Sequence, residues 1–222
     1  MTFGSPDRRA AVVGLAAGAA ALAWPCAARA GAQIEEPLAD AVRTALSSAI
    51  SAGAPPPELK FDTADAHIAY LHWLFAMSER LKKRKTETQV RVEFLQTVWY
   101  ESHRAGLEPA LVLGLIQVES GFRKYAISRA GARGYMQVMP FWARQIGDGD
   151  PARLFVMQTN LRFGCVILRH YLDVERGDPF MALGRYNGSR GQSAYPDAVL
   201  GARRQWTTAG PSGGTASAPA SR

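Results

Sequence analysis

Two cysteines among 222 residues are too few for a disulfide scaffold, and beyond the first 30 residues no apolar run approaches the roughly 18 residues needed to span a membrane. The charged share of 20% and the apolar share of 47% are globular values, which exclude a disordered chain. A polytopic membrane protein, a small disulfide-rich protein and a collagen are therefore excluded. The formal net charge of +7 favours an anionic partner.

The first residues have the pattern of a secretory signal peptide. Arg8 and Arg9 precede a short apolar stretch, and Ala28-Arg29-Ala30 supplies the small-x-small pattern of a cleavage site. We expect residues 1–30 to be removed and the protein to be exported to the periplasm of a bacterial cell envelope. The formal charge then falls from +7 to +5, because three arginines and one aspartate lie in the removed segment. Cys165 is the one cysteine that remains, and its apolar context predicts a buried, unreactive thiol.

The rest of the chain divides into three segments by composition. Residues 31–60 are rich in Ala, Ser and Pro, and we expect a weak helix followed by a stiff linker. Residues 61–206 carry nearly all the aromatic side chains and are expected to form a single domain. Residues 207–222 are mostly Gly, Ser, Thr, Ala and Pro, a composition typical of a disordered tail.

Apolar residues in segment 61–206 recur with the period of a helix, and no alternating run is long enough to predict a sheet. Helices are expected after a cap at Asp62 or Thr63, around Val90 to Val98, and at 109–120, 140–146, 156–174 and 179–186. On the first of these helices the expected apolar stripe consists of Ile68, Leu71, Leu74, Phe75 and Met77. The sequence therefore predicts a mainly α domain.

The helix expected at 109–120 carries the clearest chemical signal. It is apolar nearly all round, which indicates a buried helix, and Pro109 and Gly121 suit its two ends. Glu119 lies in its last turn, where burial and the negative end of the helix dipole both raise the pKa of the carboxyl group. An ion pair with Arg123 is the alternative, but a helix end at Gly121 takes Arg123 out of register. A buried acid with a raised pKa is what general acid catalysis near neutral pH requires.

No aspartate or glutamate occurs between Ser120 and Gly147, whereas several arginines do. Ordinary glycoside hydrolysis uses two carboxylates. If Glu119 belongs to a site that cleaves a glycan, a mechanism with one carboxylate is the simpler hypothesis.

Three segments together resemble the signature of the soluble lytic transglycosylase family: Glu119-Ser120-Gly121-Phe122, Ala126-Ile127-Ser128, and the run from Gly131 to Pro140 that contains Gly134-Tyr135-Met136-Gln137. A fourth, Arg185-Tyr186-Asn187-Gly188, resembles that family's Tyr-Asn-Ala-Gly segment. The resemblance covers about residues 108–206. It implies a single catalytic domain with a mainly α, lysozyme-like fold of the goose type. It also implies cleavage of the β-1,4 bond between N-acetylmuramic acid and N-acetylglucosamine in peptidoglycan, with a 1,6-anhydro sugar as product.

The resemblance also implies roles for individual residues. Glu119 is the single acid and then the base: it protonates the glycosidic oxygen and then takes the proton of the C6 hydroxyl, which attacks the anomeric carbon. The residues implied to line the sugar site are Ser128, Gln137, Met139, Tyr186 and Asn187. Tyr186 is expected to hydrogen-bond either Glu119 or the N-acetyl group of the substrate. The resemblance implies no metal and no cofactor.

Two positions depart from the family pattern. Tyr135 replaces the usual Leu before Met136-Gln137, either as part of the core or as an added stacking surface for a sugar. Gly188-Ser189-Arg190 replaces the usual Ala-Gly-Pro, which alters the loop beside the site. Both departures bear on substrate preference more than on chemistry.

A run of four cations, Lys82-Lys83-Arg84-Lys85, follows the first helix of the domain. Such a run is most often a solvated helix end, which the helix dipole favours. Its functional interpretation is contact with an anionic wall polymer or with lipid. Both interpretations stay open at the level of sequence.

Two other functions compete with the transglycosylase. A hydrolytic muramidase of the goose-lysozyme type would need a carboxylate that activates water, and the candidates are Asp148 and Asp150. A wall-binding scaffold without activity has no need of a buried acid such as Glu119. The expected partner is peptidoglycan rather than nucleic acid, with no transmembrane segment after signal cleavage. A role in opening the wall for a secretion, conjugation or flagellar assembly is compatible with the small size.

Overall fold

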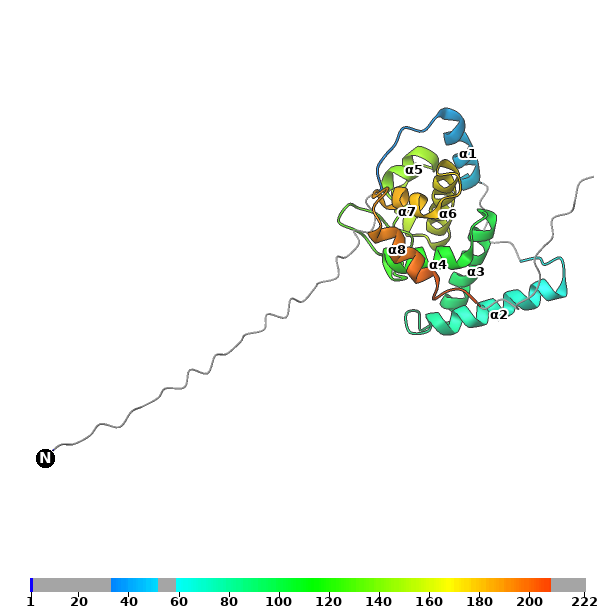
Figure 1. Ribbon diagram of the computed structural model, residues 1–222. Helices are drawn as coiled ribbons and strands as arrows, with labels where there is room; N and C mark the ends of the chain where they lie inside the picture. Colours follow the sequence, from blue (N-terminus) through cyan, green and yellow to red (C-terminus); the bar gives the residue numbers. More distant parts are fainter. Residues whose placement is uncertain (2–32, 52–58, 209–222) are drawn as a thin grey trace, which may run out of the picture.

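The computed structural model describes Met1, residues 33–51 and residues 59–208, so that the expected signal peptide and most of the expected tail lie outside the described residues (Figure 1). The described helices are α1 (Asp40–Ser51), α2 (Ala64–Leu81), α3 (Thr88–Arg104), α4 (Pro109–Ser120), α5 (Pro140–Ile146), the 3₁₀ helix η1 (Pro151–Phe155), α6 (Met157–Val174), α7 (Pro179–Asn187) and α8 (Ala194–Arg203). Among these residues the only β pairing consists of two isolated bridges, Ile127 with Arg133 and Arg133 with Val138. The prediction of a mainly α domain is confirmed.

Local sequence accounts for the helix ends. α4 and α5 have the predicted bounds, because each has proline in its first turn and each is followed by glycine. The side chain of Asp178 accepts hydrogen bonds from the second and third residues of α7, which satisfies two of the free N–H groups at its start. Thr63 caps α2 in the same way, through the N–H of Ala66.

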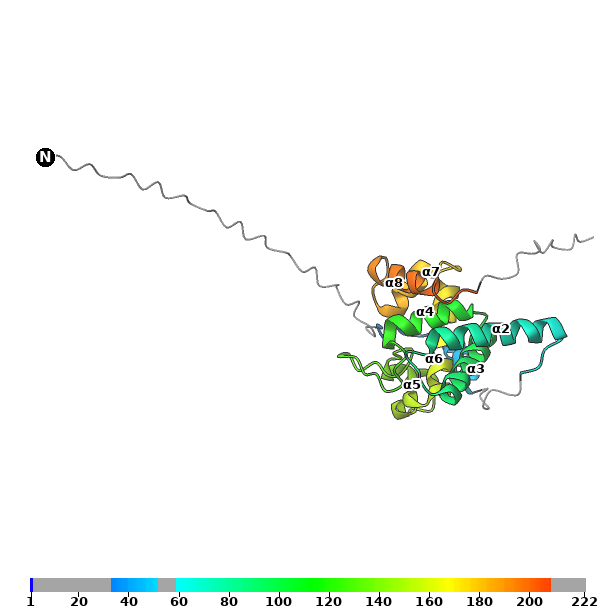
Figure 2. The same cartoon turned by 90° about the horizontal axis from the view of Figure 1, so that it is seen from below.

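α4 is the centre of the arrangement. It lies between α8 on one side and α3 on the other, and its contact with α8 is the most extensive between described helices (Figure 2). Nine of its twelve residues are buried, which fits its apolar sequence on all sides. Because Glu119 belongs to this helix, its carboxyl group is carried by the best-packed element of the domain.

The apolar stripe expected on α2 is wrong at three of its five positions, whereas Met77 is buried and Leu74 packs against the core as expected. The buried apolar residues of this helix are Tyr70, Trp73, Met77 and Leu81, whereas Ile68, Leu71 and Phe75 are exposed. The reason is that aromatic packing sets the rotation of the helix: the ring centre of Trp99 on α3 lies 4.6 Å from that of Trp73 and 5.1 Å from that of Tyr70. The expected stripe is built mainly on aliphatic side chains and therefore misses the contact of Trp73 and Tyr70 with Trp99. In both views the N-terminal half of α2 extends beyond the other helices (Figures 1 and 2).

Residues 33–51 pack onto the domain. α1 contacts α5 and α6, the indole N–H of Trp142 donates to the amide oxygen of Gln33 at 3.0 Å, and Arg185 pairs with Glu36 at 3.0 Å. The helix lies within the segment for which a weak helix and a linker are expected. These contacts attach it to the same body that carries Glu119.

α4 and α8 meet at Gly114. A Cβ atom at this position would lie 2.7 Å from the backbone nitrogen of Arg203 and 2.9 Å from its Cα, which is closer than a carbon atom can approach. The close approach of the two helices therefore depends on the absence of a side chain at Gly114.

We expect Gly114→Ala to lower the free energy of unfolding by about 1–3 kcal/mol, since α8 must move away from α4. Urea unfolding measures this change. The matched control is Gly201→Ala within α8, where a Cβ atom would contact only the end of the Arg204 side chain at 3.7 Å. Alanine there should be neutral or stabilising by up to about 1 kcal/mol. Equal stability of the two variants would contradict the packing described for these helices.

Candidate active site

Glu119 is buried at the C-terminal end of α4. Its exposed fraction is 5%. The helix stops two residues later because Gly121 adopts a left-handed conformation with φ of 57°, which glycine adopts without steric cost. The carboxyl group is thereby held at a fixed point between the helical body and the loop that leads to α5.

The two carboxyl oxygens of Glu119 have different surroundings. Oε1 accepts a hydrogen bond of 2.5 Å from the hydroxyl of Tyr195 on α8. Oε2 is buried and has no hydrogen-bond partner among the described residues. Burial raises the pKa of Glu119 to about 8, although the bond from Tyr195 acts in the opposite direction. The group is therefore protonated at neutral pH, with Oε2 available as a donor.

Tyr195 is the residue that sequence reasoning missed. The last helix expected from the sequence ends at residue 186, so no helix is predicted around Tyr195. Pro196 in fact lies in the first turn of α8, where proline is tolerated. The spacing of Tyr195, Val199 and Ala202, all of them buried, marks one face of a helix and could have predicted it.

The loop between α4 and α5 contains three of the residues that the resemblance implies to line the sugar site. Gln137 is buried, has a positive φ of 50°, and its amide nitrogen donates to the carbonyl oxygens of Ala126 and Gly134 at 3.1 and 2.9 Å. Ser128 accepts a hydrogen bond from the N–H of Ala132 at 3.1 Å. Met139 is half-buried and immediately precedes α5. Gln137 and Ser128 thus fix the shape of this loop.

Asn160 on α6 attaches the same loop to the body. Its side-chain oxygen accepts from the N–H of Met136 at 2.8 Å, and its nitrogen donates to the carbonyl oxygens of Arg133 and Leu154 at 2.8 Å each. A Cβ atom at Gly134 would lie 2.4 Å from that nitrogen. Asn160 is not among the site residues expected from the sequence, because a single asparagine in an apolar helix is only weak evidence of a functional or structural role.

Tyr186 and Asn187 lie at the end of α7. The hydroxyl of Tyr186 donates to the carbonyl oxygen of Met136 at 2.8 Å. Of the two hydrogen bonds expected as alternatives for Tyr186, the one to Glu119 is therefore made by Tyr195 instead. The physical reason is the close contact between α4 and α8, which brings Tyr195 to the carboxyl group. The charge of Glu119 nevertheless adds to burial in raising the pKa of Tyr186, so the two groups are close enough to interact. Asn187 donates to the Ser189 hydroxyl at 3.0 Å, and its buried oxygen has no partner among the described residues.

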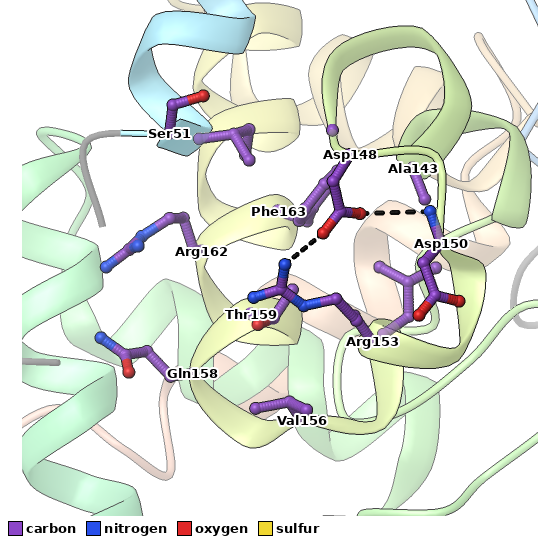
Figure 3. A pocket seen from close by; sticks show the side chains of 13 residues that line it. Ser51, Ala143, Asp148, Asp150, Arg153, Val156, Gln158, Thr159, Arg162 and Phe163 are labelled. Carbon is purple, nitrogen blue, oxygen red and sulfur yellow. Dashed lines mark hydrogen bonds and ion pairs between the residues drawn. The ribbon is translucent and has the colours of Figure 1, made fainter. Parts of the chain in front are cut away.

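Asp148 and Asp150 lie in a different place, at a pocket of about 350 Å³ between the ends of α1 and α5, η1 and the start of α6 (Figure 3). Asp148 accepts from the N–H of Asp150 and pairs with Arg153, and these contacts lower its pKa. Asp150 caps η1 through the N–H of Ala152. Glu119 does not line this pocket. Both aspartates therefore have local structural roles.

The described part of the chain contains no group of three or more His, Cys, Asp and Glu side chains arranged to hold a metal ion. Within the same residues no helix combines the length and hydropathy needed to cross a membrane. Cys165 is buried and unpaired, and burial raises the pKa of its thiol, as expected of an unreactive cysteine.

Comparison with known proteins gives matches to transglycosylases. Residues 97–203 match the family model described as Transglycosylase SLT domain. The membrane-bound lytic murein transglycosylase C of Actinobacillus pleuropneumoniae is 35% identical over 97 residues, which cover 36% of this chain and 27% of that protein. The transglycosylase of Enterobacteria phage PRD1 is 32% identical over 119 residues, which cover 49% of this chain and 42% of that protein. The chain thus spans less than half the length of these curated relatives.

Among solved structures, an inactive mutant of lytic transglycosylase Slt from Pseudomonas aeruginosa aligns with a TM-score of 0.41 at 21% identity. The alignment covers 63% of this chain and 27% of that one.

Proposed function

We propose that the protein is a lytic transglycosylase of peptidoglycan, because residues 97–203 match the family model described as Transglycosylase SLT domain. It would cleave the β-1,4 bond between N-acetylmuramic acid and N-acetylglucosamine and leave a 1,6-anhydro end on the muramic acid. The curated relatives named above carry transglycosylase activity in their names, which supports the assignment.

The observation that carries this proposal is the unpartnered Oε2 of a protonated, buried Glu119. A buried polar atom without a partner is costly, and a substrate oxygen placed against it would supply the missing hydrogen bond. In the proposed first step Glu119 donates its proton to the glycosidic oxygen as the bond to the anomeric carbon breaks.

In the second step the Glu119 carboxylate takes the proton of the C6 hydroxyl, whose oxygen attacks the anomeric carbon and closes the anhydro ring. The proton taken from the C6 hydroxyl replaces the one that Glu119 gave to the glycosidic oxygen, and the C6 oxygen supplies the electron pair of the new bond. No water is therefore consumed. The hydrogen bond from Tyr195 stabilises the carboxylate between the two steps. We assign the sugar-lining role to Ser128, Gln137, Met139, Tyr186 and Asn187, with Gln137 acting mainly through the shape of its loop.

Hydrolysis is the second candidate function, because the same acid could be combined with an activated water. The contacts of Asp148 and Asp150 argue against it, since both carboxylates hold local structure at a pocket that Glu119 does not line. Inverting glycosidases place their two carboxylates on either side of the scissile bond, about 6.5–9.5 Å apart.

We place the protein in the periplasm of a bacterial cell, on the basis of the signal-peptide pattern and the proposed substrate. We also propose that the protein opens the wall for a secretion, conjugation or flagellar assembly. Loss of assembly of such a machine after deletion of the gene is the expected result, and unchanged assembly would contradict this setting alone.

The test of activity is the release of soluble fragments from isolated peptidoglycan sacculi by the purified protein. An enzyme releases sugar-containing fragments in proportion to time. A wall-binding scaffold would sediment with the sacculi and release nothing, which would overturn the proposal.

The pH dependence of the reaction follows from the pKa of Glu119. Because Glu119 must be protonated to act as the acid, kcat/KM should fall as the pH rises through about 8. In Tyr195→Phe the hydrogen bond that lowers this pKa is lost, so the alkaline limb should move to higher pH. At pH 7 kcat/KM should fall about tenfold, the loss expected for one hydrogen bond to a charged group. A pH profile identical to that of the wild type would show that Tyr195 does not act on Glu119.

A further inference from the structure

α2 carries two apolar stripes on different faces, and one of them is exposed. The buried residues of α2 form the first stripe, which packs on Trp99 of α3. Ile68, Leu71 and Phe75 follow one another at spacings of three and four residues, so they share another face of the helix. Their exposed fractions are 49%, 47% and 71%. A row of three large apolar side chains at the surface, unlike a single exposed one, indicates an interaction surface, and we call it the exposed stripe.

The sequence itself offers no segment that could cover the exposed stripe. Among the described helices α2 packs mainly against α3, and its N-terminal half extends beyond the other helices (Figures 1 and 2). Outside the described residues, 52–58 and 209–222 contain no Val, Leu, Ile, Met or aromatic residue. The large apolar residues of 2–32 all lie in the expected signal peptide. The occupant of the exposed stripe must therefore come from outside the mature chain.

The exposed stripe ends in positive charge. Lys82 keeps a helical backbone conformation and lies seven residues after Phe75, which places it on the same face. It contacts Glu79 at 3.4 Å, but both side chains are largely exposed, and such a pair contributes little. Lys83 is exposed and, in the part of the chain that the structure describes, forms no ion pair with Asp or Glu within 4.0 Å. Asp65, in the first turn, is the other carboxylate of α2, and none lies between it and Glu79. The face therefore favours an anionic surface.

We propose that α2 docks on the surface of an anionic lipid bilayer. Ile68, Leu71 and Phe75 enter the boundary between headgroups and acyl chains, and Lys82 and Lys83 face the lipid phosphates. An apolar face combined with lysines is what holds an amphipathic helix in the plane of a membrane surface. A wall polymer is anionic as well, but it offers no apolar phase for Phe75. The proposal rests on export of the protein and is independent of the cleavage reaction.

The size of the exposed stripe argues against a second copy of this chain or another folded protein as its occupant. A stable protein interface buries roughly 800 Å² on each partner, and three partly exposed side chains offer much less than that. A bilayer needs no complementary surface, because each inserted side chain contributes in proportion to the apolar area that it removes from water. The bilayer is therefore the occupant that fits a short row of three side chains.

Sedimentation with vesicles tests the proposal on the exported form, residues 31–222. The wild type should bind vesicles of equimolar phosphatidylglycerol and phosphatidylcholine. Phe75→Ser should bind them about tenfold more weakly, because a large apolar side chain no longer enters the bilayer. Lys82→Gln/Lys83→Gln should also lose about tenfold on these vesicles, with no change on pure phosphatidylcholine.

The matched control is Val174→Ser at the end of α6. The exposed fraction of Val174 is 47%, the same as that of Leu71, and this variant should bind like the wild type. Equal binding of Phe75→Ser and the wild type would overturn the proposal, and so would a wild type that does not bind the vesicles.

A dye attached to the exposed stripe reports insertion directly. Cys165 is buried and burial raises the pKa of its thiol, so in Phe75→Cys the introduced cysteine is the reactive one. With an environment-sensitive dye on Phe75→Cys, the mixed vesicles should shift the emission to shorter wavelength. The same dye on Val174→Cys should show no shift. Equal shifts at the two positions would contradict insertion of this face.

The same variants separate the other occupants and the proposed function. A wild-type dimer in sedimentation equilibrium that Phe75→Ser dissociates would assign the exposed stripe to a second copy and contradict the proposal. Weaker binding of Phe75→Ser to purified sacculi, with unchanged binding to vesicles, would assign it to a wall polymer. Phe75→Ser should cleave soluble glycan strands like the wild type. If neither cleaves them, the proposed function fails, and the vesicle result still decides on the membrane.

Discussion

Glu119→Gln should lose at least about a hundredfold in kcat, the lower end of the effect of general acid–base catalysis. Gln has nearly the same shape as Glu and can accept the hydrogen bond from Tyr195, but it cannot donate a proton to the glycosidic oxygen. The measurement is single-turnover cleavage of a soluble glycan strand. A rate near that of the wild type would show that Glu119 is not the acid.

The same variant should be more stable than the wild type at neutral pH, which separates loss of chemistry from loss of fold. The pKa of Glu119 is raised from 4.5 to about 8 by burial, so the folded protein keeps a proton that the unfolded chain releases. The stability of the wild type therefore falls as the pH rises from about 4.5 to about 8 and then stays level. The amide of the glutamine side chain does not titrate, so Glu119→Gln should gain up to about 3 kcal/mol at pH 7. A less stable variant would contradict the raised pKa.

Arg162→Met should lower the free energy of unfolding by about 3–5 kcal/mol, the largest effect on stability that we expect. The guanidinium of Arg162 on α6 donates to Oε1 of Glu101 on α3 at 2.7 and 3.1 Å, and the exposed fractions of the two residues are 5% and 1%. Arg104 contacts the other oxygen of Glu101 at 3.3 Å. Removal of Arg162 leaves the buried carboxylate of Glu101 with too little positive charge nearby to offset the cost of its burial.

Arg169→Met is the matched control for this prediction. Arg169 is on the same helix and pairs with Asp173 four residues later, at the surface. Exposed pairs of this kind contribute about 0–1 kcal/mol. The double variant Glu101→Leu/Arg162→Met should recover part of the loss, because it removes both charges. If Arg162→Met unfolds at the same urea concentration as Arg169→Met, the pair does not stabilise the link between α3 and α6.

Glu119 could be recognised from sequence because the signals around it agree. Pro109 and Gly121 fix the ends of the helix, and the apolar residues between them indicate that it is buried on all sides. A carboxyl group in such a helix is unusual and therefore indicates a functional role. The family model confirms the resemblance read from the segments between Glu119 and Gly188, and with it the mainly α, lysozyme-like fold expected of this domain.

Tyr195 and the rotation of α2 could not be predicted in the same way. The contact of Tyr195 with Glu119 joins residues 76 positions apart in sequence. It depends on how closely α8 approaches α4 at Gly114, which is a property of the two helices together rather than of either segment. α2 offers two apolar faces, and the one that is buried is decided by Trp99 on α3. The side chains expected to line the sugar site remain predictions, since contacts within the protein do not identify contacts with a substrate.

The central claim is that one carboxyl group cleaves the strand without water. Mass spectrometry of the fragments released from purified peptidoglycan tests it most directly. Our account predicts anhydro-muropeptides, about 18 Da (one water) lighter than the products of hydrolysis, and their absence after treatment with Glu119→Gln. Fragments with reducing ends would contradict it, and would mean that a second group activates water at this site.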